Sequence, residues 1–475
     1  MSDTATVDLL IIGAGPAGMA AASEARSLGL SVALLDEQTT IGGQIYRNVE
    51  TAPAQRLDVL GPDYAAGREL AEEFRASGSR YLGGASVWNL SLDGTVDYVM
   101  NGRTGSIAGR HVLIASGAVE RPFPIEGWTL PGVMGAGAAQ ILLKGAGALP
   151  TGPVVLAGCG PLLYLFAWQY LRAGTKIKAV VDTTARSDYL RALRHGVGAL
   201  RGWQDLTKGF KLISALKSSG AKVYAGSTDL SAMGAGRVEG LSFSQGGKKH
   251  HLTASLLLLH QGVVPNTQLS WSTGVAHEWD TDQLCWRPVT DEWGRLGDTP
   301  IYVAGDSRAI VGANASAVQG RLAALAIAKR LDATTDIARR AAPLWQALKR
   351  LTHIRPFLNT LYRPKDENRV PDGNNVVVCR CEEVTAGQIR RYVELGCLGP
   401  NQTKAFGRCG MGPCQGRFCG LTVTELIAKT RGVSPAEVGY YRIRPPIKPV
   451  MLGDFLAQPN ELPNEINPLS QKEAS

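Results

Sequence analysis

The 475-residue sequence has eight cysteines but no Cys-x-x-Cys motif. Flavoproteins that reduce disulfides keep a redox-active thiol pair beside the flavin, and this short spacing is a common form of that pair. We therefore expect no disulfide-reductase mechanism. Five of the eight cysteines lie between Cys379 and Cys419, and in a reducing cytoplasm such clustering indicates a metal site rather than disulfides.

Signals for export and for membrane insertion are also missing. The N-terminus has no basic segment followed by an apolar core and a small-residue cleavage site, so we expect no export and a cytoplasmic location. The longest nearly uncharged run covers residues 151–171, but Gly158, Gly160 and Pro161 interrupt it. This run therefore predicts a strand, a turn and a helix instead of a membrane span.

Charge and histidine content narrow the function further. The net charge is +9, but no aromatic-basic recognition pattern accompanies it, which favours a solvated or partner-facing surface over nucleic-acid binding. The seven histidines are scattered, and we predict no catalytic residue in this chain. A content of 44% apolar and 19% charged residues is typical of a globular protein, here of two or three domains.

A glycine motif near the N-terminus predicts a dinucleotide site. The apolar run at 9–12 leads into Gly-x-Gly-x-x-Gly and then into small residues with helical potential, which indicates a buried strand, a tight turn and a helix. Gly15 lets a pyrophosphate approach the backbone, and Gly18 lets the helix pack on its strand. A second strand, residues 31–35, ends in two acids where a carboxylate can hold a ribose hydroxyl. The predicted residues are Gly13, Gly15, Pro16, Ala17, Gly18, Asp36 and Glu37.

Three later segments extend this site towards a flavin. A glycine pair followed by Gln44 would bring backbone amides close to a flavin or its phosphates, with a simple loop as the alternative. A strand at 111–114 ends in two small residues and a glycine, where flavoproteins with two dinucleotide domains pass the chain between domains. A strand at 300–304 ends beside Asp306, which can bond a ribityl hydroxyl; this second signal favours FAD over NAD. The added residues are Gly42, Gly43, Gln44, Ala115, Ser116, Gly117, Gly305 and Asp306.

A second nucleotide-type unit is predicted with a defect. The strand at 154–156 leads into Gly158-Cys159-Gly160-Pro161 and a helix, and the next strand ends at Asp182. Leu163 stands where the third glycine belongs. A leucine there pushes the helix away from the strand and blocks the close approach of a nicotinamide dinucleotide. We expect the fold of this unit to survive and its NAD(P) binding to be lost.

The clustered cysteines predict a soft metal site. Cys379-x-Cys381 and the group Cys409, Cys414 and Cys419 offer thiolates from two tight loops, which suits either zinc or an iron–sulfur cluster. A cluster is favoured because the module follows a flavin domain, and a cluster can transfer electrons whereas zinc cannot. Five cysteines for four places leave one spare. The isolated cysteines, which we interpret as core residues, are Cys159, Cys285 and Cys397.

Together these motifs resemble the larger accessory subunit of bacterial opine (octopine or nopaline) oxidases. The D-hydroxyproline dehydrogenase alpha subunit shares the same order, as does the hydrogen cyanide synthase B subunit, and the likeness covers about residues 5–435. It implies an α/β flavoprotein with two dinucleotide-binding, Rossmann-like domains and a C-terminal bacterioferritin-associated-ferredoxin-like [2Fe–2S] domain. The predicted boundaries are 1–130 and 275–345 for a discontinuous FAD-binding domain, 131–274 for a degenerate NAD(P)-binding-like domain, 346–374 for a linker, 375–435 for the [2Fe–2S] domain and 436–475 for a C-terminal tail.

The resemblance also implies which cysteines bind the cluster. Relatives such as the glycerol-3-phosphate dehydrogenase tail have another residue at the position of Cys409. Carrying the ligands over by motif assigns Cys379, Cys381, Cys414 and Cys419, with Cys409 as the spare.

The function implied is an electron relay. The substrate-oxidising flavin is expected on a separate, smaller FAD subunit, with room for a further flavin at the interface and for a third small subunit. The expected reaction oxidises a C–N bond of an amino-acid derivative, opines first, and the electron acceptor could draw the protein to the inner membrane. Three alternatives stay open: an NAD(P)H-dependent ferredoxin or rubredoxin reductase, a zinc scaffold, and NAD at the first site as in the more distant sarcosine oxidase.

Overall fold

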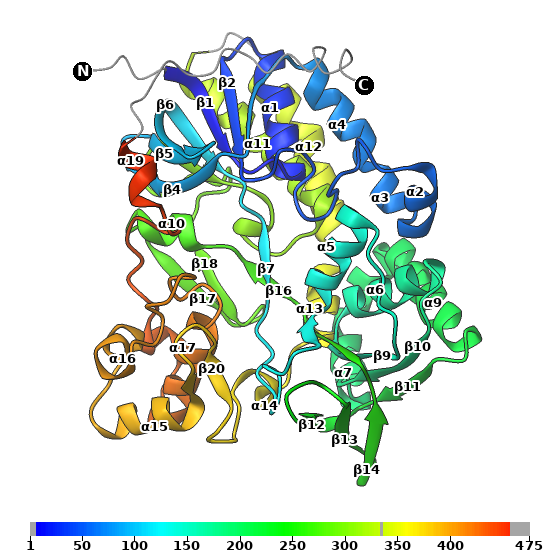
Figure 1. The fold of residues 1–475 in the computed structure, drawn as a ribbon. Coiled ribbons are helices and arrows are strands. Elements are labelled where there is room, and N and C mark those ends of the chain that lie inside the picture. Colours follow the sequence, from blue (N-terminus) through cyan, green and yellow to red (C-terminus); the bar gives the residue numbers. More distant parts are fainter. Residues whose placement is uncertain (1–5, 333–335, 457–475) are drawn as a thin grey trace.

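The computed structural model describes residues 6–332 and 336–456, which form two nucleotide-type units and a smaller C-terminal domain (Figure 1). The first unit is organised around strand β1, whose residues Leu9–Ile12 are buried. Its strands are β1 (Thr6–Ile12), β2 (Val32–Asp36), β3 (Arg80–Gly83), β4 (Ser86–Leu90), β5 (Thr95–Met100), β6 (Arg103–Ile114) and β19 (Ile301–Val303). Their order is β3-β2-β1-β6-β5-β4, and β19 joins the last residues of β6.

Strand β6 belongs to two parts of this sheet. Residues 103–108 form an antiparallel hairpin with β5, whereas 108–114 run parallel to β1. The carboxyl ends of β1, β2, β6 and β19 therefore meet at one edge, where open α/β sheets bind their ligands.

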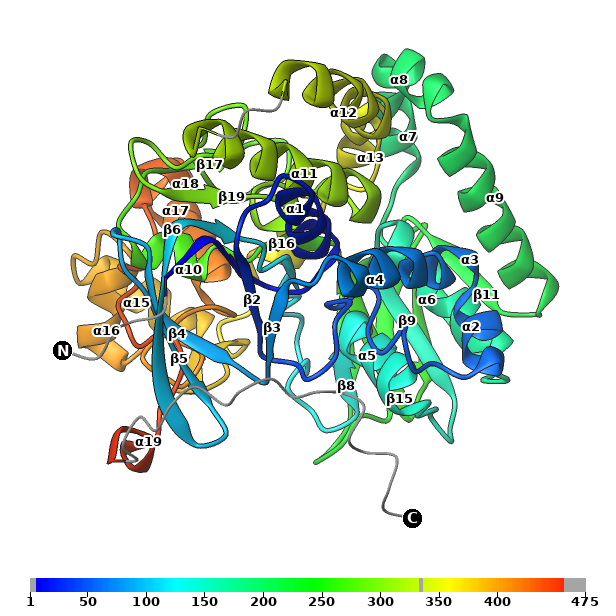
Figure 2. The ribbon, with the colours of Figure 1, turned by 90° about the horizontal axis from the view of Figure 1, so that it is seen from above.

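Helices α1 and α11 cover one face of the first sheet and lie against each other (Figure 2). An added Cβ at Gly320 of α11 would lie 2.0 Å from the carbonyl oxygen of Ala17 in α1, so glycine permits this close crossing. The helices of this unit are α1 (Pro16–Ser27), α2 (Ala54–Leu60), α3 (Pro62–Ala65), α4 (Gly67–Ala76), α11 (Ala313–Arg330) and α12 (Ile337–Thr352).

The second unit has a parallel sheet in the order β11-β10-β9-β15-β8 and an antiparallel three-stranded sheet, β12-β13-β14. Its strands are β8 (Val133–Gly135), β9 (Val154–Cys159), β10 (Ile177–Asp182), β11 (Lys222–Ala225), β12 (Thr228–Met233), β13 (Gly240–Gln245), β14 (Lys248–Thr253) and β15 (Leu256–Gln261). Its helices are α5 (Ala136–Ala146), α6 (Pro161–Arg172), α7 (Arg186–Ala192), α8 (Gly196–Arg201) and α9 (Trp203–Ser218).

Two short strands connect the units. β7 (Ala118–Glu120) carries the chain into the second unit and β16 (Val263–Pro265) brings it back, and they pair antiparallel. The chain then forms α10 (Gln268–Ser272), β17 (His277–Asp280) and β18 (Cys285–Pro288) before it returns to β19.

The C-terminal domain shares a core with the first sheet. Val423 and Leu426 of its central helix belong to the same buried cluster as Leu10 of β1. Its elements are α13 (Arg355–Leu361), α14 (Asp366–Arg369), β20 (Val377–Cys379), β21 (Val384–Thr385), α15 (Ala386–Glu394), α16 (Pro400–Gly407), α17 (Gly420–Arg431), α18 (Pro435–Val438) and α19 (Leu452–Leu456). Among the described residues, no helix is both long and apolar enough to span a membrane.

Two predicted boundaries look different in the structure. The segment predicted as a linker, 346–374, contains the end of α12 together with α13 and α14, and α13 packs on α7 of the second unit. The described part of the predicted tail packs into the protein, because Tyr441, Ile443 and Ile447 are buried. Residues 457–475 of that tail, and 1–5 of the first unit, lie outside the described residues.

Candidate functional site

A cavity of about 950 Å³ lies along the carboxyl ends of the first sheet and continues towards the second unit. Most of the predicted cofactor residues line it. These are Gly13, Gly15, Pro16, Ala17, Asp36, Glu37, Gly43, Gln44, Ala115, Ser116, Gly117 and Asp306. Gly18, Gly42 and Gly305 were predicted with them and do not line the cavity.

The first and last glycines of the helix turn have different tasks. An added Cβ at Gly18 would lie 1.9 Å from the carbonyl oxygen of Gly13, so this glycine serves strand–helix packing. An added Cβ at Gly15 would meet no protein atom within 4 Å and would project into space beside the cavity. Nothing in the protein requires glycine at position 15, whereas a phosphate on the N-terminus of α1 does.

The glycine pair after β2 closes over this turn. Gly42 donates its N–H to the carbonyl oxygen of Ala14 at 2.9 Å. Gly43 has a φ of +59°, and an added Cβ there would lie 2.9 Å from the Cα of Gly15. The two loops are therefore in close contact, and Gly43 and Gln44 both face the cavity.

The two acids after β2 have different partners. The carboxylate of Asp36 accepts the N–H of Ala14 at 2.7 Å and that of Gln38 at 2.8 Å, and burial raises its pKa. Glu37 forms an ion pair with Lys448 from the C-terminal segment, which also lines the cavity. A carboxylate has room for further donors beyond two hydrogen bonds, so Asp36 can still hold a ribose hydroxyl.

Asp306 and Ser116 fix the far end of the predicted flavin site. One carboxylate oxygen of Asp306 accepts the N–H groups of Val311 and Gly312 at 2.8 and 3.0 Å, which leaves the other free for a ribityl hydroxyl. Ser116 donates its hydroxyl to the carbonyl oxygen of Asn266 at 3.1 Å. The cavity thus combines a phosphate turn, a ribose acid and a ribityl acid, a donor set that fits FAD. When bound, FAD supplies two-electron storage here.

Lys144 is a cavity residue that the sequence analysis missed. Its side chain is buried on α5, and Nζ donates to the carbonyl oxygen of Gln44 at 3.1 Å. Burial, and to a smaller extent the charge of Arg47, lowers the pKa of Lys144 to about 7. A single charged residue within the apolar helix Ala136–Ala146 was a signal in the sequence that could have identified it.

A buried pair on the second-unit side of the cavity was also missed. His260 lies at the end of β15, and its Nδ1 is 2.7 Å from a carboxylate oxygen of Glu120. Glu120 in turn accepts the N–H of Gly137 at the start of α5. Within the described residues, Nε2 of His260 has no hydrogen-bond partner.

The second nucleotide turn is closed by the protein itself. Asp182, the acid predicted to select the nucleotide, is 1% exposed and accepts the hydroxyl of Tyr164 and the N–H of Thr184. Burial raises the pKa of Asp182. Leu163 is fully buried in the core of this unit, so the third glycine position has become a packing position.

The helices α13 and α14 cover the same turn from outside. The thiol of Cys159, inside the glycine turn, donates to the carbonyl oxygen of Tyr362 at 3.6 Å. Lys365 forms a 2.7 Å ion pair with Asp188, whose side chain is buried at the start of α7. The segment predicted as a linker therefore lies where a nucleotide would approach.

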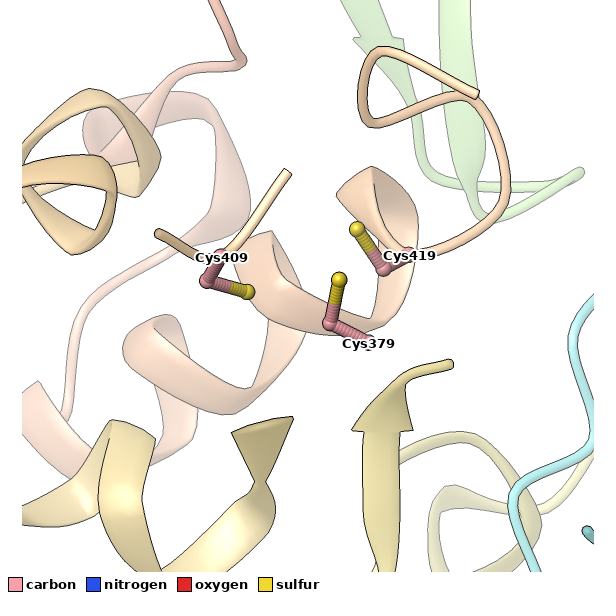
Figure 3. Close-up of side chains that lie close together, drawn as sticks. All are labelled: Cys379, Cys409 and Cys419. Atoms are coloured by element: carbon pink, nitrogen blue, oxygen red, sulfur yellow. The ribbon is translucent and has the colours of Figure 1, made fainter. Parts of the chain in front are cut away.

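Three of the five clustered cysteines meet at one point (Figure 3). The sulfur atoms of Cys379, Cys409 and Cys419 all lie within 4.8 Å of one another. The pKa of Cys379 is lowered because the thiols of Cys409 and Cys419, and nearby backbone N–H groups, donate to its sulfur. A thiolate is the form that binds iron.

The other two predicted ligands form a pair of their own. The thiols of Cys381 and Cys414 are hydrogen-bonded to each other, and Cys381 is exposed. The structure thus divides the predicted set into Cys379 with Cys419 and Cys381 with Cys414, and it places the expected spare, Cys409, beside the first pair. Five thiols around two loops are a donor set that fits an iron–sulfur cluster.

Tyr441 shapes the cysteine loop and could not be recognised from the sequence. Its hydroxyl donates to the carbonyl oxygen of Cys409 at 3.1 Å and also lies 3.4 Å from the Cys409 sulfur. An added Cβ at Gly410 or Gly416 would lie 2.5 or 2.7 Å from the Tyr441 ring. The glycines of this loop therefore make room for a ring from the C-terminal segment.

The cysteine loop and the flavin cavity share a wall. Arg417 and Phe418, directly before Cys419, line the cavity. Gln268, which also lines it, donates its side-chain N–H to the carbonyl oxygen of Gln415 at 3.0 Å. Residues next to the cluster ligands thus contact the space predicted for FAD.

Comparison with known proteins agrees with this geometry. Residues 7–329 match the family model of the pyridine nucleotide-disulphide oxidoreductases, and residues 377–429 match the BFD-like [2Fe-2S] binding domain. The chain is 46% identical to the larger of these relatives' components, the opine oxidase "A" polypeptide of Rhizobium meliloti, over 95% of this chain and 88% of that protein. It is 31% identical to the HcnB component of hydrogen cyanide synthase from Pseudomonas aeruginosa, over 94% and 97% of the two chains.

Among solved structures, the L-proline dehydrogenase of P. horikoshii superposes with a TM-score of 0.69, at 20% identity, over 96% of this chain and 80% of that one. This likeness concerns the fold alone. Together the comparisons confirm the predicted fold class, the resemblance to the opine oxidase subunits, and the two cofactors, FAD and a [2Fe–2S] cluster.

Substitution at Gly15 should separate ligand binding from folding. We expect Gly15→Val to leave the melting temperature of the flavin-free protein unchanged, because its side chain enters open space, and to reduce bound FAD at least tenfold. Gly18→Val is the matched control and should destabilise the fold itself by about 1–3 kcal/mol or more. Flavin absorbance per purified chain and thermal unfolding measure both effects. Full flavin content in Gly15→Val would contradict the site.

Lys144→Met should change the pH dependence of stability. The lysine titrates near 10.5 when unfolded and near 7 when folded, so the unfolded chain binds more protons between these values and wild type loses stability as pH falls. We expect the variant's advantage in free energy of unfolding to grow as pH falls through this window and then to stay constant. Urea denaturation of the flavin-free protein measures it. An advantage that does not vary with pH would contradict the burial of this charge.

Proposed function

The chain belongs to the pyridine nucleotide-disulphide oxidoreductase family, and we propose that it is the electron-relay subunit of a flavoenzyme that oxidises the C–N bond of an amino-acid derivative. Its relatives in opine oxidase and in hydrogen cyanide synthase are both named as subunits. We therefore infer that this chain also acts within a complex.

The shared wall between the flavin cavity and the cysteine loop is the observation that carries this proposal. Arg417 and Phe418 reach from the cluster domain into the cavity, and Gln268 bonds the two parts together. Electrons need short paths between cofactors, and this wall offers one without a moving domain. The chain's own contribution is to hold and orient two redox groups and to exclude solvent between them.

Substrate oxidation is assigned to a partner. An amine loses a hydride and a proton across its C–N bond and gives an imine, which water hydrolyses. This needs a base placed above a flavin, and the described residues show no such base with a substrate-sized pocket of its own. We propose that the partner is a smaller, FAD-containing catalytic subunit, joined by an interfacial flavin and a third small subunit.

Opines are the proposed substrate class, because the printed names of relatives 46% identical to this chain are those of opine oxidase subunits. The hydrogen cyanide synthase and D-hydroxyproline dehydrogenase roles are the alternatives within the same architecture. A cytoplasmic location follows the same reasoning.

A self-contained NAD(P)H-dependent reductase is the competing function. It needs an open second nucleotide site, and here Asp182 is buried while Tyr362 lies on the glycine turn. The lack of a Cys-x-x-Cys pair also speaks against disulfide reduction. Both observations favour the relay.

The cluster ligands are proposed as Cys379, Cys381, Cys414 and Cys419. The motif likeness supports this set, and the side chain of Cys409 is fully buried and already lies beside the Tyr441 hydroxyl. Cys409 then packs behind the cluster as a neighbour of its ligands.

Serine variants test this assignment. Replacing any of the four ligands should remove or destabilise the cluster, because serine is a harder ligand than thiolate. Cys409→Ser is the matched control and should keep about two irons per chain, since a hydroxyl can retain the contact with Tyr441. Iron analysis and the visible spectrum report the result. Iron loss in Cys409→Ser together with retention in Cys381→Ser would reassign the ligands.

The relay itself is tested by separating the chain from its partner. We expect the purified chain, loaded with FAD and cluster, to show no turnover of octopine or nopaline with an artificial dye. Co-expression with the catalytic subunit should give amine-dependent dye reduction. NADH and NADPH should not bleach the flavin under anaerobic conditions. Turnover by the single chain, or rapid bleaching by either nucleotide, would contradict the proposal.

A further inference from the structure

The stretch 186–218, which contains α7, α8 and α9, has an apolar outer face. Its inner face is conventional, because Ala199, Leu212 and Leu216 are buried against the second unit. The outer face carries large apolar side chains that are between 59% and 80% exposed, and these are Leu190, Leu193, Val197, Leu200, Trp203 and Phe210. Most follow each other at intervals of three or four residues, so they form one stripe along the helices. A contiguous exposed stripe of this kind indicates a binding surface.

Basic residues flank the stripe. The stretch contains seven lysines and arginines, which are Arg186, Arg191, Arg194, Arg201, Lys208, Lys211 and Lys217. Of its two acids, Asp188 is buried in ion pairs with Arg191 and Lys365. Asp205 is therefore the one exposed acid among residues 186–218, all of which the structure describes.

The neighbouring elements add charge of the same sign. Helix α13 contacts α7 and α8, and an added Cβ at Gly198 of α8 would lie 2.6 Å from the carbonyl oxygen of His353. The end of α12, directly before this contact, carries the exposed residues Lys349 and Arg350. One pole of the molecule is thus both basic and apolar.

We propose that this pole binds the surface of an anionic lipid bilayer, with the stripe inserted between the headgroups and the basic residues on the lipid phosphates. Helices with Trp, Phe and Leu on one face and Lys and Arg beside them lie in the membrane interface in this way. The charge of an anionic leaflet complements the seven basic residues. This inference does not depend on the proposed substrate or cofactors.

The position of the stripe favours a membrane over the catalytic partner. A partner that exchanges electrons with this chain must approach the cluster, where Cys381 is exposed. Both views of the molecule place α8 and α9 on the side opposite the C-terminal domain with α15 and α17 (Figures 1 and 2). A partner docked at the cluster leaves the stripe free.

Vesicle sedimentation with the full, cofactor-loaded protein tests the proposal. We expect the protein to pellet with vesicles of phosphatidylcholine and phosphatidylglycerol, and not with phosphatidylcholine alone. The double variant Leu193→Glu, Leu200→Glu should reduce the bound fraction at equal lipid at least tenfold, because two leucines that insert between the headgroups become charges. Arg194→Glu with Arg201→Glu should move binding to lower salt.

The matched control is Leu92→Glu with Leu142→Glu, which changes two leucines of 51% and 48% exposure away from the stripe. It should bind vesicles as wild type does, and an unchanged visible spectrum shows that each variant is folded. Absence of binding to anionic vesicles, or equal binding by wild type and Leu193→Glu, Leu200→Glu, would overturn the proposal. So would loss of the catalytic subunit from that variant without any vesicle binding by wild type, because the stripe would then be a protein interface.

Discussion

The short pairing of β7 with β16 sets the distance between the flavin cavity and the cysteine loop. Gly117, just before β7, accepts the N–H of Asn266, just after β16, at 2.9 Å. Two residues later, Gln268 is bonded to the cysteine loop. Because the chain must leave the first unit and return within a few residues, the end of β6 and the cysteine loop are held on two sides of the same segment. The cavity, the cluster and the path between them depend on this crossing.

The second unit shows how a nucleotide fold can persist without its ligand. Its glycine turn, parallel sheet and terminal acid are present, but Tyr164 and Thr184 occupy the acid and Tyr362 lies on the turn. The space has been filled by α13 and α14, which connect to the cluster domain. The unit therefore serves as a rigid seat that orients the C-terminal domain, and the buried Leu163 contributes to its core.

The sequence predicted the features that depend on neighbouring residues. The turn at Gly13–Gly18, the acid Asp36 and the cysteine loops are local patterns, and they occupy the sites where they were expected. The loss of the second site was also expected, although only Leu163 could be used as evidence. Contacts across the fold were not predictable: Gln268 and Gln415 are 147 residues apart, and Cys159 and Tyr362 are 203 apart. Such pairs are determined by how whole units pack, and no short motif encodes them.

The ion pair of Lys448 with Glu37 has a consequence for assembly. Lys448 and Ile447 lie on the cavity wall near the ribose acid, and Ile447 donates its N–H to the carbonyl oxygen of Trp88. This segment is synthesised after every strand and helix of the first unit. During translation the adenosine end of the cavity is therefore open, and it is covered only when the end of the chain arrives. The order of synthesis lets a nascent chain take up its dinucleotide first and then retain it beneath its own C-terminal segment.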